Sequence, residues 1–204
     1  MAVYQRHILP RLISWGMRQK QLVPLRERVV GAARGRVLEV GIGSGLNLPF
    51  YHRDVEAVLG VDPSIELLHM AKKHTPWVHF PVELTEASAE DLPLDDRSVD
   101  SVVMTWTLCS VGDPRRALAE IRRVLRPGGA LIFIEHGQAP EAGTRRWQDR
   151  LTPAWRRLAG GCHLNRPIDE LIGAAGLRLA ELDTGYLVKG PRPLTFHYRG
   201  IARP

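Results

Sequence analysis

From residue 36 onward, short apolar runs rich in β-branched residues alternate with longer stretches in which apolar positions recur every three or four residues. Such alternation predicts parallel strands joined by helices, because strands covered on both faces are apolar throughout and each covering helix has one apolar side. We expect strands at residues 36–40, 57–61, 78–84, 100–105 and 130–135. We expect the helices between them at residues 44–51, 64–74 and 114–125.

The two ends of the chain extend this core. Apolar spacings of three and four residues predict a first short helix that contains Trp15, and Pro24 suits the first turn of a second. Beyond residue 140 we expect two helices and then two strands that pair antiparallel, at residues 145–158, 168–175, 177–182 and 194–201. The predicted fold is α/β: a Rossmann-like, doubly wound sheet of seven mostly parallel strands with one antiparallel strand, preceded by an N-terminal helical segment.

The chain has 204 residues, of which 44% are hydrophobic and 25% are charged, a composition typical of one globular domain. It contains no internal repeat, low-complexity tract or Ser/Gly-rich linker that would indicate a boundary. We therefore expect a single domain over residues 1–204, in which residues 1–35 are appended to a core of residues 36–204.

Two features predict a cytoplasmic protein. No apolar run approaches the roughly 20 residues of a membrane-spanning helix, and no charged and then apolar leader is recognisable. Cys109 and Cys162 allow at most one disulfide, and neither lies in a spacing typical of metal ligands. We expect two reduced, catalytically inert thiols and no metal site.

A glycine-rich turn follows the first predicted strand, with glycines at positions 41, 43 and 45. A dinucleotide fingerprint would require a further glycine where this chain has Leu46, and a Walker loop would require Gly-Lys-Ser/Thr, which is absent. Glu39 lies two residues before the first glycine. Because a carboxylate repels pyrophosphate and attracts a cation, this turn is suited to a ligand that carries an ammonium or sulfonium group.

Asp62 ends the second predicted strand, 17 residues after Gly45. A carboxylate at this point of a doubly wound sheet can accept hydrogen bonds from both hydroxyls of a ribose. Glu39 and Asp62 together therefore predict a site for an adenosine that bears a cationic tail.

Between about Arg36 and Leu182 the chain resembles the class I S-adenosylmethionine (SAM)-dependent methyltransferases. The resemblance rests on the segments Leu38–Gly45, Val61–Ser64, Ala89–Pro93 with Ser98–Asp100, and Leu125–Gly129. It implies SAM as the cofactor, S-adenosylhomocysteine as its product, no metal, and cofactor contacts from Glu39, Gly41, Gly43, Gly45, Asn47, Asp62, Pro63, Ser64, Ala89, Glu90, Thr105 and Trp106. Many members carry Asp where this chain has Ser88, which leaves the backbone of Ala89 and Glu90 as the expected adenine contacts.

Three further segments, Thr105–Val111, Ile134–His136 and Gly161–Arg166, resemble the group that includes animal thiol S-methyltransferases. This narrower resemblance implies methyl transfer to a small, lipophilic acceptor such as a thiol. His136, which follows the fifth strand, is our first candidate for a base, and His163 is the second. The residues expected around the acceptor are Trp15, Trp106, Thr107, His136, Trp155 and His163, with Trp147 as a further candidate.

Other functions stay open at this point. Residues 37–140 hold 9 basic and 15 acidic side chains, whereas the two flanks together carry a net charge of +12. These basic flanks suit N-methylation of a phospholipid or of a small amine, although we expect at most weak peripheral membrane contact. A non-catalytic SAM-binding protein is another alternative. Nucleic acid is not an expected partner, because the Asn/Asp-Pro-Pro-aromatic segment of base-amine methylases and any RNA-binding module are absent.

The expected assembly is a monomer or a homodimer that acts on a small molecule. Residues 1–35 and 145–158 are expected to cover the acceptor site as a lid, because apolar faces and positive charge gather in these two segments outside the cofactor motifs.

Overall fold

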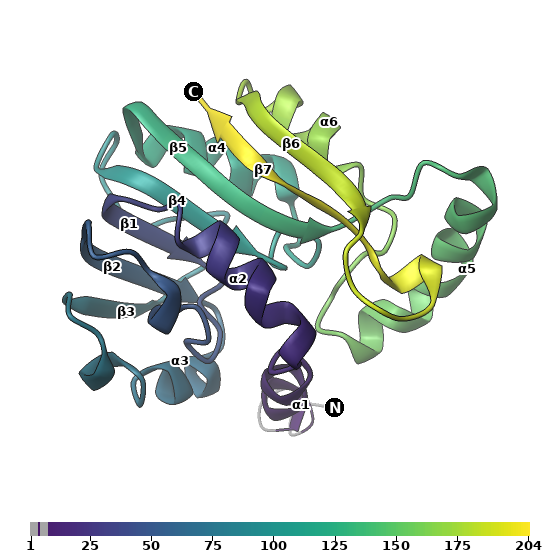
Figure 1. Ribbon diagram of the computed structural model, residues 1–204, viewed down its shortest axis with the longest axis horizontal. Coiled ribbons are helices and arrows are strands. Elements are labelled where there is room, and N and C mark those ends of the chain that lie inside the picture. Colours follow the sequence, from purple (N-terminus) through teal and green to yellow (C-terminus); the bar gives the residue numbers. More distant parts are fainter. Residues whose placement is uncertain (1–3, 5–7) are drawn as a thin grey trace.

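The computed structural model describes residue 4 and residues 8–204 and contains a seven-stranded sheet flanked by helices (Figure 1). The strands are β1 Gly35–Val40, β2 Val55–Asp62, β3 Val82–Glu86, β4 Val99–Thr105, β5 Leu125–His136, β6 Arg178–Tyr186 and β7 Phe196–Arg203. The helices are α1 Leu9–Gly16, α2 Val23–Val30, α3 Ile65–Ala71, α4 Pro114–Val124, α5 Ala142–Leu158 and α6 Ile168–Ala174. Short 3₁₀ turns are η2 Lys20–Leu22, η3 Leu48–Phe50, η4 Thr75–Trp77 and η5 Arg192–Leu194.

The strand order is β3-β2-β1-β4-β5-β7-β6, and the first five of these strands are parallel. β7 runs antiparallel to both of its neighbours, β5 and β6. The predicted fold class is thus confirmed, including the antiparallel pairing of the last two strands. The strand order reverses between β1 and β4, which is where open α/β sheets form a ligand crevice at the carboxyl ends of their strands.

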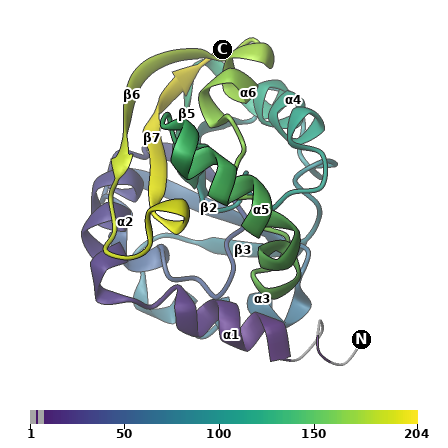
Figure 2. The same cartoon turned by 90° about the vertical axis from the view of Figure 1, so that its right-hand side faces the viewer.

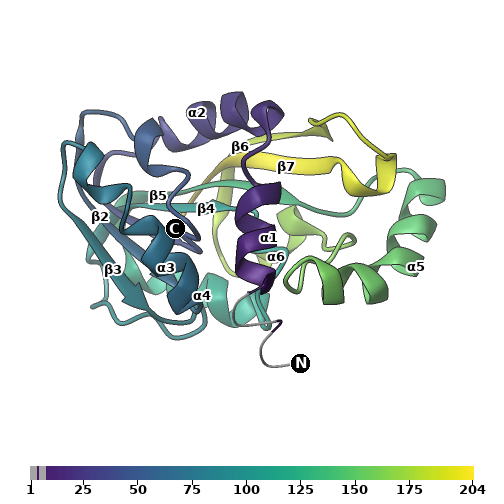
Figure 3. The same cartoon turned by 90° about the horizontal axis from the view of Figure 1, so that it is seen from below.

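Each face of the sheet is covered by its own set of helices (Figures 1 and 3). α4 and α6 pack against one face, over buried residues such as Leu38 and Phe133. α2 and α3 pack against the other face, over Val37 and Ile132. Because β1, β4 and most of β5 are buried on both faces, the centre of the sheet is a rigid support for the loops at its carboxyl edge.

Three predicted elements differ from the structure. Residues 44–51 form no α-helix and contain only the 3₁₀ turn Leu48–Phe50, because Gly43 and Gly45 have positive φ angles and Pro49 follows. β3 begins at Val82 rather than at residue 78, after the turn Thr75–Trp77. β5 begins at Leu125 rather than at residue 130, so the strand includes the Pro127–Gly129 segment.

α1 and α5 lie at the carboxyl edge of the parallel strands, the edge that Figure 2 turns toward the viewer. α1 is joined to the glycine-rich turn by a hydrogen bond of 2.9 Å between the hydroxyls of Ser14 and Ser44. Within residue 4 and residues 8–204, no helix is both long and apolar enough to cross a membrane.

Candidate active site

The glycine-rich turn after β1 is shaped by backbone angles that favour glycine. Gly41, Gly43 and Gly45 have φ angles of +72°, +57° and +77°. A Cβ atom on Gly41 would collide with the side chain of Thr107, which packs directly over it. The turn is further fixed by a hydrogen bond of 3.0 Å from the Gly43 amide to the Asp62 carboxylate. Glycine at position 41 is therefore required by both strain and space.

Asp62 lies at the end of β2 with 7% of its surface exposed. Besides the Gly43 amide, it accepts a hydrogen bond of 2.8 Å from the Ser64 amide, across Pro63. Burial raises the pKa of Asp62, and these two amides oppose the shift. Ser64 is the residue that caps α3, through its hydroxyl and the Leu67 amide. Each Asp62 oxygen keeps a further lone pair that can accept a hydroxyl donor.

Glu39 is 1% exposed and lies beside this turn. Its carboxylate accepts hydrogen bonds of 2.7 Å from the Asn47 amide and 2.8 Å from the Tyr51 hydroxyl. Burial raises the pKa of Glu39 to about 7. Asn47 also donates to the Thr105 hydroxyl at 2.9 Å, which connects the end of β1 with the end of β4.

Arg26 and Tyr51 belong to this polar cluster although no motif pointed to them. Arg26, from α2, donates to the Asn47 side-chain oxygen at 2.6 Å and to the Met17 carbonyl at 3.1 Å. Its guanidinium carbon also lies 4.8 Å from the centre of the Trp106 ring. Burial lowers the pKa of Arg26 to about 10. One sequence signal was available: Arg26 lies four residues before Val30, on a side of α2 that is buried.

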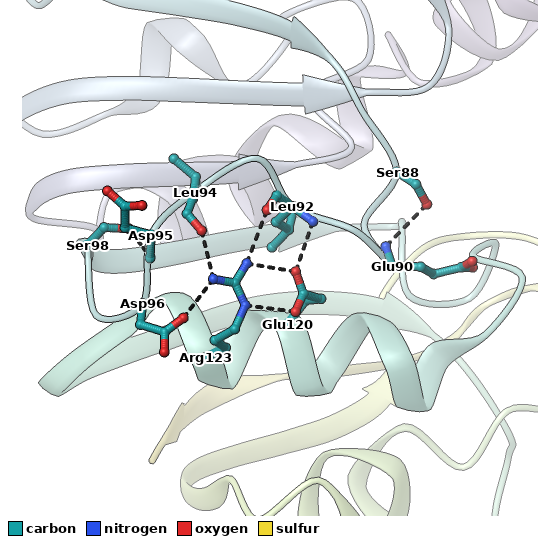
Figure 4. Close-up of polar contacts among 9 residues, drawn as sticks. All are labelled: Ser88, Glu90, Leu92, Leu94, Asp95, Asp96, Ser98, Glu120 and Arg123. Atoms are coloured by element: carbon teal, nitrogen blue, oxygen red, sulfur yellow. Dashed lines mark hydrogen bonds and ion pairs between the residues drawn. The ribbon is translucent and has the colours of Figure 1, made fainter.

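The loop after β3 carries the residues expected near adenine. The Glu90 amide donates to the Ser88 hydroxyl at 3.2 Å (Figure 4). The Glu90 carboxylate accepts a hydrogen bond of 2.7 Å from the Asp113 amide. Ala89 is buried between them. Ser88 therefore orders the loop backbone, and the Glu90 amide is already paired with its hydroxyl.

Further along this loop, the backbone of Leu92 and Leu94 is held in place by two residues of α4, Arg123 and Glu120. Figure 4 shows the Arg123 guanidinium against the Glu120 carboxylate and the carbonyls of Leu92 and Leu94. A cavity of about 480 Å³ is lined in part by this segment, which belongs to the helix-free connection between β3 and β4. Its lining residues include none of the expected cofactor contacts.

The segment after β4 is held by Glu135, a fully buried residue of β5. Its carboxylate accepts hydrogen bonds of 2.9 Å from the Thr107 amide and 3.1 Å from the Cys109 amide. Burial raises the pKa of Glu135 to about 7. Trp106, just before, has a φ angle of +53°, which is strained for a non-glycine residue. Glu135 is thus a positioning residue for the Trp106–Thr107 segment.

His136 and Cys162 form a buried pair beside this segment. The Cys162 sulfur lies 3.6 Å from Nδ1 of His136, which is 5% exposed. Among the described residues, Nε2 of His136 has no hydrogen-bond partner. Hydrogen bonding to Cys109 and contact with His136 lower the pKa of the Cys162 thiol well below its usual range. The sequence predicts an inert thiol at position 162 and gives no sign of the neighbours that lower its pKa.

His163 and Trp155 lie next to the same pair. His163 Nδ1 is 3.2 Å from the Cys109 carbonyl, and burial lowers the pKa of its ring. The Trp155 side chain contacts Cys162. The structure therefore brings together the acceptor-side candidates Trp106, Thr107, His136, Trp155 and His163.

Trp15 and Trp147 lie outside this group, and they are 79% and 56% exposed. Neither ring is buried with the residues around His136. Within the described residues, no group of three or more His, Cys, Asp or Glu side chains is arranged to hold a metal ion.

Three comparisons connect this site with known proteins. Residues 38–133 match the family model described as Methyltransferase domain. The chain is 41% identical over 143 residues to the human thiol S-methyltransferase TMT1B, across 66% of this chain and 57% of that protein. It is 40% identical over 109 residues to a phosphatidylethanolamine N-methyltransferase of Cereibacter sphaeroides, across 52% of this chain and 53% of the other.

A solved structure of a SAM-dependent methyltransferase from Thermotoga maritima superposes with a TM-score of 0.68 at 23% sequence identity. The superposition covers 98% of this chain and 99% of the other, and it shows a shared fold. The chain spans about half the length of the curated relatives it matches.

Proposed function

We propose that this chain, which is similar to class I SAM-dependent methyltransferases, transfers a methyl group from SAM to a small lipophilic acceptor, with a thiol as the first choice. The observation that carries the proposal is the pair of buried carboxylates, Glu39 and Asp62, on either side of the glycine-rich turn. The similarity to thiol S-methyltransferases supports a sulfur acceptor.

The residues present fit SAM. Asp62 keeps acceptor capacity for the two ribose hydroxyls, and the position beside Gly43 is open, since a Cβ there would meet only the Gly41 carbonyl oxygen, at 4.0 Å. Glu39 and Thr105, which the side-chain nitrogen of Asn47 holds together, offer oxygen atoms to the ammonium group of the methionine part. When bound, SAM supplies an electrophilic methyl group on a sulfonium sulfur.

The protein's task in this reaction is alignment and removal of one proton. The acceptor sulfur must lose its proton to attack the methyl carbon, whereas the departing thioether is neutral and requires no acid. His136 lies at the end of β5 with its Nε2 unpaired among the described residues, so it can accept that proton. Burial lowers the pKa of the neighbouring His197 to about 4, so this second ring stays neutral and adds no charge beside His136.

The pKa of Glu39 predicts a pH-dependent affinity for SAM. A cationic ligand requires the carboxylate form, and in the free protein burial raises the pKa of this group to about 7. Binding should therefore release a proton, and affinity should rise about tenfold between pH 5.5 and 7, below the range in which an α-amino group titrates. Calorimetry in buffers of different ionisation enthalpy measures both quantities. Glu39→Gln should bind more weakly and without this slope; an equally steep slope in the variant would exclude Glu39 as its source.

The acceptor class is tested by the release of S-adenosylhomocysteine with matched alkyl thiols, amines and phenols of equal chain length. We expect the thiol to give the highest kcat/KM, and longer alkyl chains to lower KM by burial of apolar surface. A faster reaction with the amine would indicate that nitrogen, rather than sulfur, is the acceptor atom.

Methylation of a phospholipid amine is the second candidate, and one specific observation favours it. The chain is 40% identical over 109 residues to a phosphatidylethanolamine N-methyltransferase. The same assay with phosphatidylethanolamine in mixed micelles separates the two candidates, since the sulfur-specific enzyme leaves this lipid unmodified.

A further inference from the structure

α1 turns two of its large apolar side chains, Leu12 and Trp15, toward solvent. Its buried residues are Pro10 and Ser14, and the Ser14 hydroxyl is bonded to Ser44. Leu12 and Trp15, in contrast, are 49% and 79% exposed. A helix whose only role is to cover a core has the opposite arrangement, with its large apolar residues inward. The outer face of α1 is therefore an apolar surface without a partner among the described residues.

α5 repeats this arrangement. It buries Gln148 and Thr152, and Gln148 is bonded to the Ala139 amide at 2.9 Å and the Gly137 carbonyl at 3.0 Å. These polar contacts attach the helix to the body of the protein. Trp147, Leu151 and Leu158 are all exposed, and their spacings of four and seven residues place them along one side of the helix.

α1 and the end of α5 lie close together, and both helices carry exposed arginines. Ile13 of α1 packs against Gly160, two residues after the end of α5, and Figure 2 shows both helices on the side of the molecule that faces the viewer. The guanidinium of Arg150 lies 5.8 Å from the centre of the Trp147 ring. Exposed arginines lie along both helices, at positions 11, 18, 145, 146, 150, 156 and 157.

We infer that α1 and α5 form an interfacial surface that docks on a lipid membrane containing anionic headgroups. Tryptophan and leucine side chains enter the boundary between headgroups and acyl chains, and the arginines pair with lipid phosphates. A second copy of the chain would place an equally basic surface against this one, and like charges repel. An anionic membrane carries the opposite charge, so it is the partner that this surface fits. The sequence pattern predicted only weak contact, because it does not tell which side of each helix faces outward.

This surface goes beyond methyl transfer and does not depend on it. Docking would place the carboxyl edge of the sheet, with Trp106 and His136, next to the membrane. A lipophilic acceptor dissolved in the bilayer would then reach the site without crossing bulk water.

The test is co-sedimentation of the full chain, without SAM or acceptor, with vesicles of phosphatidylcholine alone or with about 30% phosphatidylglycerol. We expect at least about tenfold tighter binding to the anionic vesicles, and measurable binding that persists at about 0.5 M NaCl because inserted apolar side chains are not screened. The double variant Trp15→Ser/Trp147→Ser should bind at least about tenfold more weakly. Both positions are exposed, so the fold should be retained, as circular dichroism checks.

Trp77→Ser is the matched control, since Trp77 is 85% exposed in η4 beside the edge strand β3. It should bind vesicles as the unmodified chain does. Failure of the unmodified chain to bind anionic vesicles, or equal binding by the double variant, would overturn the inference. Self-association that the double variant abolishes, without vesicle binding, would assign the surface to a second copy instead. Vesicle binding without any methyl transfer would count against the proposed function and leave this surface intact.

Discussion

Asp62→Ala is expected to weaken SAM binding about 10- to 150-fold, because hydrogen bonds from a ribose to a carboxylate contribute roughly 1.5 to 3 kcal/mol. Asp62 is buried at the end of β2 and is oriented by the amides of Gly43 and Ser64. Its carboxylate is therefore held in place before the cofactor binds. Isothermal titration calorimetry with SAM and with S-adenosylhomocysteine measures the effect, which should be of similar size for both because they share the ribose.

Two controls accompany this variant. Asp95→Ala removes an exposed carboxylate near the end of the loop after β3 and should leave the affinity unchanged. Thermal unfolding of Asp62→Ala is needed as well, since the Gly43 and Ser64 amides lose their acceptor. A folded variant with unchanged affinity would remove Asp62 from the ribose site.

His136→Asn is expected to lower the rate of methyl transfer to a thiol by about 10²-fold, the lower part of the range for a general base, with little change in SAM affinity. The lower part applies because an alkyl thiol already supplies some thiolate near neutral pH. The variant should also change how the rate depends on pH, because a general base acts only without its proton. Initial rates between pH 5.5 and 9, with SAM affinity at each pH, give both quantities.

His163→Asn is the matched comparison, because His163 lies on the same side of the site through its contact with the Cys109 carbonyl. A His136→Asn variant within about threefold of the unmodified rate across the profile would return His136 to a packing role. A large loss in His163→Asn alone would then assign the proton to that residue.

The part of the site that could be predicted is encoded locally. The glycine-rich turn, Glu39 and Asp62 are recognisable because a strand end, a turn and a carboxylate lie within a few residues of one another. Their positions follow from parallel strands, whose carboxyl ends meet at one edge. The fold class could also be predicted, because the alternation of strands and helices is a local pattern in the sequence.

The parts that could not be predicted depend on contacts between distant segments. Arg26 reaches Asn47 from α2, and Glu135 of β5 binds backbone amides that follow β4, so neither role has a local signature. The expected helix at residues 44–51 is absent because the glycine conformations and Pro49 outweigh its apolar spacing. Trp15 lies in the predicted helix but on its outer side, because periodicity defines two faces without telling which is buried.

Transfer of the methyl group to a thiol is the step that defines the proposed activity. The decisive measurement is a single turnover in which the protein, loaded with methyl-labelled SAM, is mixed with a small alkyl thiol and the products are analysed by mass spectrometry. The proposed activity predicts that the label appears on the thiol sulfur while S-adenosylhomocysteine accumulates in equal amount. Labelled SAM that stays intact, in a protein whose affinity for SAM depends on Asp62, would contradict it and identify a SAM-binding protein without methyl-transfer activity toward thiols.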